Sequence, residues 1–296
     1  MPCSKCGHPV MLPVMLRNFE LRTIIASGGM GTVYTAQDVK LERQVALKMM
    51  KREVAADPAS LQAFYREARA GASLNHTNII HIYSFDEFDG QPYLVMELAD
   101  QGSLDSRIET EARVPELDVL DVGIKICSAL TTALQHKLLH RDIKPGNILY
   151  NIDGEPKLID FGLVRAAEDD TWEDQIWGTV YYVAPEKLER KGEDFHSDMY
   201  SLGATLYHAL TGHVPFEGTV EEVVSAHVHT ALTPPNLVCP DITELTSNAL
   251  ARALAKHPSE RFESYDDFRM ALEAARSQVL VGQVRQADSG KSWWRR

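Results

Sequence analysis

The sequence is poor in cysteine, with four in 296 residues. So few cysteines exclude a disulfide scaffold and are typical of a protein kept in a reducing compartment. No stretch approaches about 18 uninterrupted apolar residues, so no membrane-spanning helix is expected. Basic residues are also scarce, 30 against 42 acidic ones, and the formal net charge of −12 argues against a nucleic-acid partner.

What the sequence does contain is ordinary for a folded globular protein. Apolar residues make up 44% of the chain, with 18 glycines and 14 prolines. The length predicts two domains, or one large domain near the size at which single cores divide.

The first 16 residues are expected to form an N-terminal tail and lack the charged start of a signal peptide. Cys3 and Cys6 form a Cys-x-x-Cys pair followed by His8. Two interpretations stay open: a mobile tail with reduced thiols, or a zinc site completed by His8 or by a second chain.

Residues 281–296 are expected to form a C-terminal tail of different character. Trp293 and Trp294 stand beside Arg295 and Arg296, a combination found at membrane interfaces. Two interpretations stay open: the segment is a frayed tail in water, or it lies next to a membrane helix.

Between these tails, the pattern changes from strands to helices near residue 100. Residues 17–99 predict strands at 19–26, 32–37, 44–50, 79–85 and 93–98. A helix capped by Asp57 and Pro58 should bury Leu61, Phe64, Ala68 and Ala72, with Glu67 at the edge of that face. Residues 100–280 predict helices at 117–134, 199–210, 245–254 and 265–280, the first with Cys127 in its core.

Two features of the first part point to phosphate chemistry. A glycine-rich turn between two strands contains Ser27, Gly28, Gly29 and Gly31, whose backbone amides could approach phosphate oxygens. Lys48 lies between apolar residues on a strand, where a charge is costly unless paired. Glu67 on the following helix is its candidate partner, either in a purely structural pair or in a nucleotide site.

More specific motifs follow in the second part. The chain contains His140-Arg141-Asp142-Ile143-Lys144-Pro145-Gly146-Asn147, then Asp160-Phe161-Gly162, Gly178-Thr179 and Ala184-Pro185-Glu186. In order and spacing they resemble the eukaryotic-type serine/threonine protein kinases, most of all the bacterial members, over residues 17–280.

The resemblance implies an α+β fold with two lobes: a small antiparallel-sheet lobe carrying one key helix and a larger, mainly helical lobe. It implies that Lys48, oriented by Glu67, holds the ATP phosphates and that Asp142 accepts the proton of the substrate hydroxyl. Lys144 would steady the transferred phosphate. Asp160 and Asn147 would bind Mg²⁺, with Mn²⁺ as a possible substitute.

The adenine site is also assigned by resemblance. Val33, Ala46 and Leu149 would enclose the base, and Met96 would stand at the back of the pocket. The backbone of Glu97 and Ala99 would bind its edge. Structural roles are implied for further residues: Asp198 as the anchor of the catalytic loop, a Glu186–Arg261 ion pair, and His140 with Phe161 in an apolar spine.

Some positions depart from the family pattern. Ala26 replaces the first glycine of the turn, and Gly71 stands where a larger apolar residue is usual. Ser103 and Gly146 replace acidic residues of arginine-seeking members, so no such preference is predicted. Arg141 beside Asp142 marks kinases with a cationic pocket for an activation-segment phosphate, and Thr171 is the predicted phosphosite because Thr179 is needed near the substrate.

The predicted function is therefore phosphorylation of protein serine and threonine side chains, with autophosphorylation in signalling. Two alternatives are a pseudokinase scaffold that binds nucleotide without turnover and, ranked lower, a small-molecule kinase. A cytoplasmic location is expected, or the cytoplasmic side of a membrane-anchored kinase. A homodimer is possible by resemblance, and membrane contact is expected only if the C-terminal tail continues into a membrane helix.

Overall fold

The computed structural model describes residues 11–161 and 180–291, and side-chain positions as far as residue 284. Cys3, Cys6, Thr171, Thr179 and the paired tryptophans of the C-terminal tail lie outside these residues. The chain forms two compact units. The first contains the residues up to Gly102 and a segment that begins at Leu149, and the second contains Ser103–Ile148 and the later part of the chain. The single predicted boundary near residue 100 is therefore incomplete, because the chain returns to the first unit.

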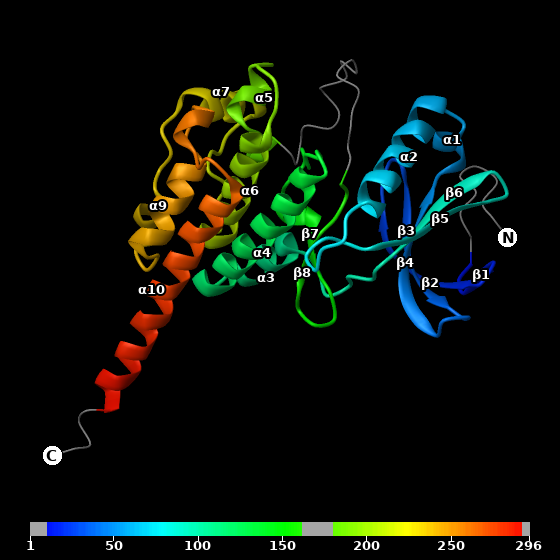
Figure 1. Ribbon diagram of the computed structural model, residues 1–296, viewed down its shortest axis with the longest axis horizontal. Helices are drawn as coiled ribbons and strands as arrows, with labels where there is room; N and C mark the ends of the chain where they lie inside the picture. Colours follow the sequence, from blue (N-terminus) through cyan, green and yellow to red (C-terminus); the bar gives the residue numbers. More distant parts are fainter. Residues whose placement is uncertain (1–10, 162–179, 292–296) are drawn as a thin grey trace. The chain divides into compact units, whose positions relative to one another are not determined.

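The first unit is built on a six-stranded antiparallel sheet with the strand order β1-β2-β3-β4-β6-β5 (Figure 1). Its strands are β1 (Val14–Leu16), β2 (Phe19–Ser27), β3 (Gly31–Asp38), β4 (Arg43–Met50), β5 (Ile82–Phe88) and β6 (Gln91–Met96). The assignment of residues 14–16 to a tail was wrong, because Val14–Leu16 pair with the start of β2.

The strand predicted at 79–85 begins three residues later, at Ile82. The apolar residues before it pair elsewhere: Ile79 forms a parallel bridge with Leu158, and Ile80 N–H donates to the Leu158 carbonyl at 3.0 Å. Leu158 ends the short strand β8 (Pro156–Leu158), which pairs with β7 (Ile148–Tyr150).

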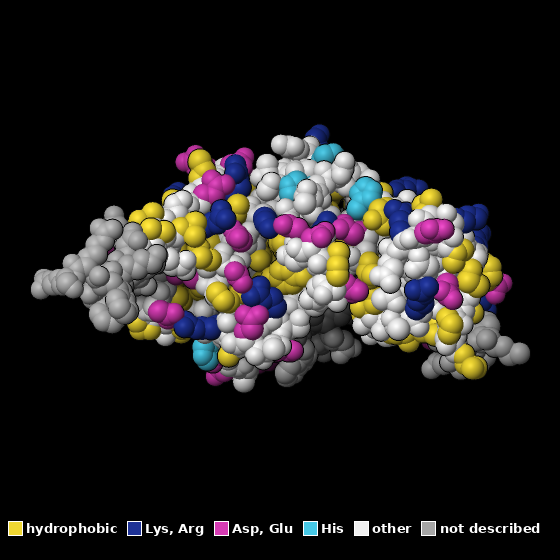
Figure 2. Space-filling model, turned by 90° about the horizontal axis from the view of Figure 1, so that it is seen from below, with side chains coloured by type: hydrophobic (Ala, Val, Ile, Leu, Met, Phe, Trp, Pro, Cys, Tyr) yellow, Lys and Arg dark blue, Asp and Glu magenta, His cyan; other side chains and the backbone are white. Residues whose placement is uncertain are grey.

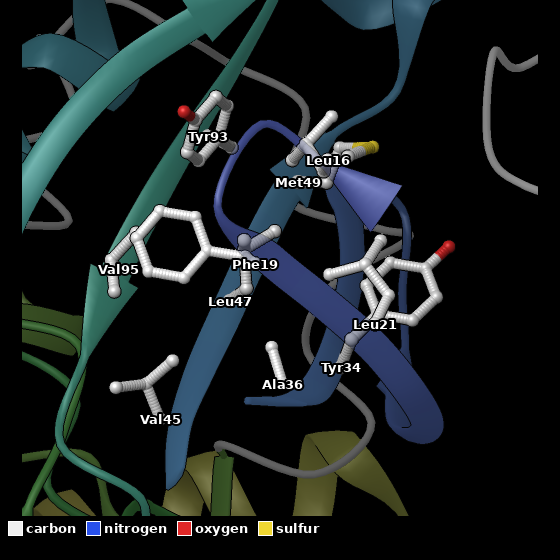
Figure 3. Close-up of a cluster of buried hydrophobic side chains, with 10 residues drawn as sticks. All are labelled: Leu16, Phe19, Leu21, Tyr34, Ala36, Val45, Leu47, Met49, Tyr93 and Val95. Carbon is white, nitrogen blue, oxygen red and sulfur yellow. The ribbon is translucent and has the colours of Figure 1, made fainter. Parts of the chain in front are cut away.

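Alternation along the strands gives the sheet two different faces. One face carries the apolar cluster drawn in Figure 3, in which Tyr34, Val45, Leu47, Tyr93 and Val95 are all nearly inaccessible to solvent. Phe19 packs edge-on against Tyr93 at 6.4 Å between ring centroids. The strands β1 and β2 close this cluster with Leu16, Phe19 and Leu21.

The opposite face of the sheet is packed against helix α2 (Pro58–Ala72), which follows the short helix α1 (Arg52–Ala55). The predicted cap is confirmed: Asp57 Oδ2 accepts the Ser60 N–H at 2.9 Å, with Pro58 in the first turn. Phe64 and Ala68 are buried as predicted. Ala72 is exposed instead, and Gly71 takes the buried position at the end of the helix.

The second unit is mainly helical. Its helices are α3 (Leu104–Glu111), α4 (Glu116–Gln135), α5 (Pro185–Leu188), α6 (Phe195–Thr211), α7 (Val220–His229), α8 (Pro235–Val238), α9 (Glu244–Ala253) and α10 (Tyr265–Lys291), with 3₁₀ turns η1 (Pro145–Asn147), η2 (Val180–Tyr182) and η3 (Pro258–Glu260).

The long helices α4, α6, α9 and α10 pack on one another and form the core of this unit (Figure 1). Cys127 of α4 is fully buried, as predicted, and burial raises the pKa of its thiol. Gly123 allows close packing: a Cβ at this position would lie 2.8 Å from methyl groups of both Leu206 and Leu272.

Helix α10 continues beyond the residue-280 boundary assigned to the C-terminal tail (Figure 1). Its outer part carries the exposed residues Leu280, Val281 and Val284. In the described part of the chain, no helix is both long enough and apolar enough to span a bilayer.

On the face drawn in Figure 2, acidic and basic side chains are interspersed.

Candidate active site

The glycine-rich turn joins β2 to β3. Gly28 N–H donates to the Gly31 carbonyl at 2.9 Å, and Ser27 Oγ lies 3.1 Å from Thr32 Oγ1. Glycine is required at position 31, because a Cβ would collide with the carbonyl of Met49 on the adjacent strand. Gly28 and Gly29 face open space. Ala26 pairs with Val33 within the sheet, so the substitution falls in a strand and leaves the turn itself unchanged.

Sheet register places three of the predicted adenine-site residues on the face that carries Lys48. Val33 pairs with Lys48, and Ala46 pairs with Met96, so these four residues share one face of the sheet. Leu149 lies in β7, and the next residue, Tyr150, exchanges backbone hydrogen bonds with Gln101 and Gly102 at 2.9–3.0 Å. These bonds hold β7 beside the chain segment that follows Ala99.

Lys48 connects two carboxylates. Its Nζ lies 2.7 Å from Glu67 Oε1 and 3.0 Å from Asp160 Oδ1. The predicted pairing with Glu67 is confirmed. Burial alone would lower the pKa of Lys48, but Asp160 and Glu67 outweigh it and hold this pKa well above its usual value. Burial, aided by Asp160, raises the pKa of Glu67 against the opposing effect of Lys48.

Asp160 follows β8 and lies in the left-handed region at φ 58°. An aspartate tolerates this backbone better than most residues. Its side chain is 38% exposed, so the carboxylate remains accessible beside Lys48. Phe161 next to it is buried.

Met96, Glu97 and Ala99 follow directly from β6. The N–H of Glu97 donates to the His81 carbonyl at 2.8 Å, which leaves the Glu97 carbonyl as the group that could bind a base. The Glu97 side chain forms a 2.6 Å ion pair with Lys157. Lys157 was not among the predicted site residues, although a lysine among apolar residues just before Asp160 was a usable signal.

The residues of the His140–Asn147 motif lie in the second unit. Asp142 Oδ2 lies 2.8 Å from Lys144 Nζ and 2.9 Å from Asn147 Nδ2. Asn147 Nδ2 also donates to the Asp142 carbonyl at 2.7 Å. The amide oxygen Oδ1 of Asn147 is the atom of this side chain that could bind a cation. The structure therefore brings Asp142, Lys144 and Asn147 together as the sequence predicted.

This loop rests on the fully buried Asp198 of α6. The two carboxylate oxygens of Asp198 each accept a backbone N–H at 2.7 Å, one from His140 and one from Arg141. Burial raises the pKa of Asp198, while nearby His140 and these hydrogen bonds oppose the shift. His140 is also fully buried.

Acidic and basic groups meet beside Arg141. Its Nε lies 3.9 Å from Glu193 Oε2, and Lys187 Nζ lies 3.5 Å from the same oxygen. Lys187 also donates to the Arg141 carbonyl at 3.2 Å. Glu193, a residue that the sequence analysis missed, therefore places an anion next to Arg141.

The predicted pair of Glu186 and Arg261 is confirmed as a bidentate ion pair with both distances at 2.8 Å. Arg261 is almost inaccessible and also donates to the carbonyls of Ala255, His196 and Lys256. Through these bonds the arginine joins several loops of the second unit.

The chain matches the protein kinase domain model over residues 19–270. It belongs to the protein kinase family. It is 34% identical to the serine/threonine-protein kinase PknB of Mycobacterium leprae over 268 residues, 88% of this chain and 43% of that protein. It is 35% identical to PknE of Mycobacterium tuberculosis over 259 residues, 87% of this chain and 46% of that protein.

A solved kinase domain has the same fold. The crystal structure of the Mycobacterium tuberculosis PknI kinase domain aligns with a TM-score of 0.68 and 26% identity. That alignment covers 90% of this chain and 99% of the other. The two-lobed fold is confirmed, and the chain spans less than half the length of the curated relatives it matches.

Two of the positions that depart from the family pattern, Gly71 and Ser103, are explained by their local contacts. Gly71 lies against β5, where a Cβ would come within 2.5 Å of Ile82 Cδ1, so a larger side chain needs Ile82 to move. Ser103 caps helix α3: its Oγ accepts the Ser106 N–H at 3.1 Å, and Ser106 Oγ accepts the Ser103 N–H at 2.8 Å.

Proposed function

We propose that this kinase domain transfers the γ-phosphoryl group of ATP to serine and threonine hydroxyls of proteins. The observation that carries the proposal is the placement of Lys48 between Glu67 and Asp160, in a chain that also holds Asp142 against Lys144 and Asn147. Phosphoryl transfer depends on such positioning and charge neutralisation.

The first unit binds the nucleotide in this proposal. Backbone amides of the glycine-rich turn and the Lys48 ammonium hold the phosphates, and Glu67 fixes the direction of Lys48. Val33, Ala46 and Leu149 enclose the adenine ring. The carbonyl of Glu97 and the backbone of Ala99 bind its edge.

The second unit supplies the groups for transfer. The substrate hydroxyl gives its proton to the Asp142 carboxylate as the hydroxyl oxygen bonds to the γ-phosphorus and the bond to the β,γ-bridging oxygen of ATP breaks. Lys144 balances negative charge on the phosphoryl group. The bonds from Lys144 and Asn147 fix the orientation of the carboxylate.

Mg²⁺ is the proposed metal, and Mn²⁺ would fit the same oxygen ligands. The carboxylate of Asp160 and the amide oxygen of Asn147 are its candidate protein ligands. In residues 11–161 and 180–291, no group of three or more His, Cys, Asp or Glu side chains could hold a metal ion. A hard cation held by these two oxygens would take its remaining ligands from ATP and water. When bound, Mg²⁺ neutralises charge on the phosphates.

The proposed substrates are proteins, in line with the relatives named as serine/threonine-protein kinases. The pseudokinase alternative has no observation in its favour, because Lys48, Asp142, Asn147 and Asp160 are all present. Phosphorylation of Thr171, homodimer formation, membrane attachment and a cytoplasmic location stay predictions.

Phosphate transfer from labelled ATP to a generic protein substrate tests the proposal. Wild type should transfer label, and Asp142→Asn and Lys48→Met should lose at least about 100-fold in kcat/KM. Equal signals from wild type and Asp142→Asn would reveal a contaminating kinase. Nucleotide binding by a wild type without transfer would support the pseudokinase alternative.

A further inference from the structure

Lys157, which is buried, and Glu97, which is partly buried, form an ion pair that the kinase motifs do not include. Lys157 Nζ lies 2.6 Å from Glu97 Oε1, and the two side chains are 8% and 18% exposed. An unpaired ammonium at this depth would cost several kcal/mol, so the pairing itself is expected.

Glu97 is fixed at three points. Lys157 binds one carboxylate oxygen, the other accepts the His81 N–H at 3.3 Å, and the Glu97 N–H donates to the His81 carbonyl at 2.8 Å. The group that remains to bind a base is the Glu97 carbonyl. The bonds to the side chain and to the N–H of Glu97 restrain the residue that carries this carbonyl.

Lys157 is equally well anchored. It is the middle residue of β8, and the next residue, Leu158, exchanges backbone hydrogen bonds with Asn78 and Ile80 at 2.9 and 3.0 Å. Asp160 lies two residues after Leu158.

We infer that Lys157 is a positioning residue for nucleotide selection: through Glu97 it fixes the base-binding carbonyl and ties it to the strand that leads to Asp160. The inference rests on the proposed function. Adenine presents an exocyclic amino group that donates to a fixed carbonyl. Guanine presents a carbonyl oxygen at the same place, which a fixed carbonyl repels. Without the bond to Lys157, the peptide group that contains the Glu97 carbonyl can rotate, and the site can then accept either base.

Affinities of the isolated protein for MgADP and MgGDP test this inference by calorimetry. Wild type should prefer MgADP strongly. Lys157→Met and Glu97→Gln should each weaken MgADP binding by at least about tenfold and reduce the ADP-to-GDP preference. Lys157→Arg should restore most of that preference. Because the residues act as one pair, the Glu97→Gln/Lys157→Met double variant should be no worse than either single variant.

Glu186→Gln is the matched control, since it breaks a buried ion pair in the second unit. It should lower the unfolding temperature and leave the ADP-to-GDP preference unchanged. If Lys157→Met keeps the wild-type ADP-to-GDP preference, the inference is overturned while the proposed function stands. If Lys157→Met does not fold, the same result for Glu97→Gln overturns it. A folded wild type that binds neither nucleotide would overturn both.

Discussion

The Asp198 carboxylate accepts the backbone N–H of Arg141 at 2.7 Å, and Arg141 lies in the left-handed region at φ 68°. This backbone costs a non-glycine residue on the order of 1 kcal/mol. A buried carboxylate therefore holds the residue that precedes Asp142 in a conformation it would not adopt alone.

Replacing Asp198 by Ala should remove this support. One buried and one partly buried N–H group would lose their acceptor, at up to about 1–3 kcal/mol each. We expect the free energy of unfolding to fall by at least about 2 kcal/mol and kcat to fall more than the affinity for MgADP. Urea unfolding, calorimetry and steady-state kinetics measure these quantities.

The matched control is Asp194→Ala at the start of the same helix. Asp194 caps α6 by accepting the His196 N–H at 2.8 Å, and its side chain is 60% exposed. Loss of this cap should cost about 1 kcal/mol and leave kcat unchanged. Equal losses of kcat in the two variants would contradict the role assigned to Asp198.

His227 predicts a pH dependence of stability. It is fully buried on α7, its Nδ1 lies 2.8 Å from the Tyr200 hydroxyl, and burial, with help from Lys256, lowers its pKa to about 4. The unfolded chain binds a proton at this residue near pH 6.5 and the folded chain does so only near pH 4. Stability should therefore fall as the pH drops through this window, by about 3 kcal/mol in total.

Urea unfolding of wild type and His227→Phe between pH 7 and pH 4 isolates this contribution. The variant should start less stable, because the Tyr200 hydroxyl loses its partner, and should lose less stability on acidification. Tyr200→Phe keeps the buried imidazole and should keep the wild-type slope. Parallel pH profiles for wild type and His227→Phe would exclude His227 as the source.

Much of the first unit could be predicted from the sequence because the residues that determine it lie close together in the chain. Alternation in β4 places Lys48 and Ala46 on one face, and helical spacing places Glu67 on the buried side of α2. Their contact then follows from packing α2 on that face. The short strand β1 was missed, because three residues are too few to show alternation and only the pairing with β2 defines it.

The remaining differences come from contacts between distant segments. Ile79 and Ile80 continue the apolar pattern of β5, but their backbone pairs with Leu158, so the strand begins later. Lys157 and Glu97 lie in different parts of the sequence and meet only because β8 returns to the first unit. Glu193 likewise lies beside Arg141 through tertiary packing, which no spacing rule indicates.

The buried Glu186–Arg261 pair should stabilise the protein more than a surface pair of the same geometry. Arg261 and Ser197 hold the pKa of Glu186 below its usual value, although burial acts against them. The pair should therefore stabilise the protein above the unfolded-state pKa near 4.3, and this contribution should be lost as the pH falls through the folded-state pKa.

Glu186→Gln should cost about 3–5 kcal/mol at pH 7, and the gap to wild type should narrow below about pH 4. Arg113 and Asp241 form a bidentate pair at 2.8–2.9 Å on the surface and provide the comparison. Asp241→Asn should cost less than about 1 kcal/mol. Urea unfolding of both variants at pH 7 and about pH 3.5 checks this. Similar costs at pH 7 would show that burial does not set the strength of the pair.

Gly71 and Ile82 should be coupled in stability. Alanine at position 71 favours the helix by up to about 1 kcal/mol, but its Cβ would lie 2.5 Å from Ile82 Cδ1. Ile82→Val removes that carbon at about 0.5–1.5 kcal/mol. Together the two changes should be more stable than the sum of the single effects by about 1 kcal/mol, since each relieves a cost of the other. Urea unfolding of wild type, both single variants and the double variant gives the coupling energy. Strict additivity would mean that Ile82 moves away from the new methyl group without cost, and the position would then be open to larger side chains.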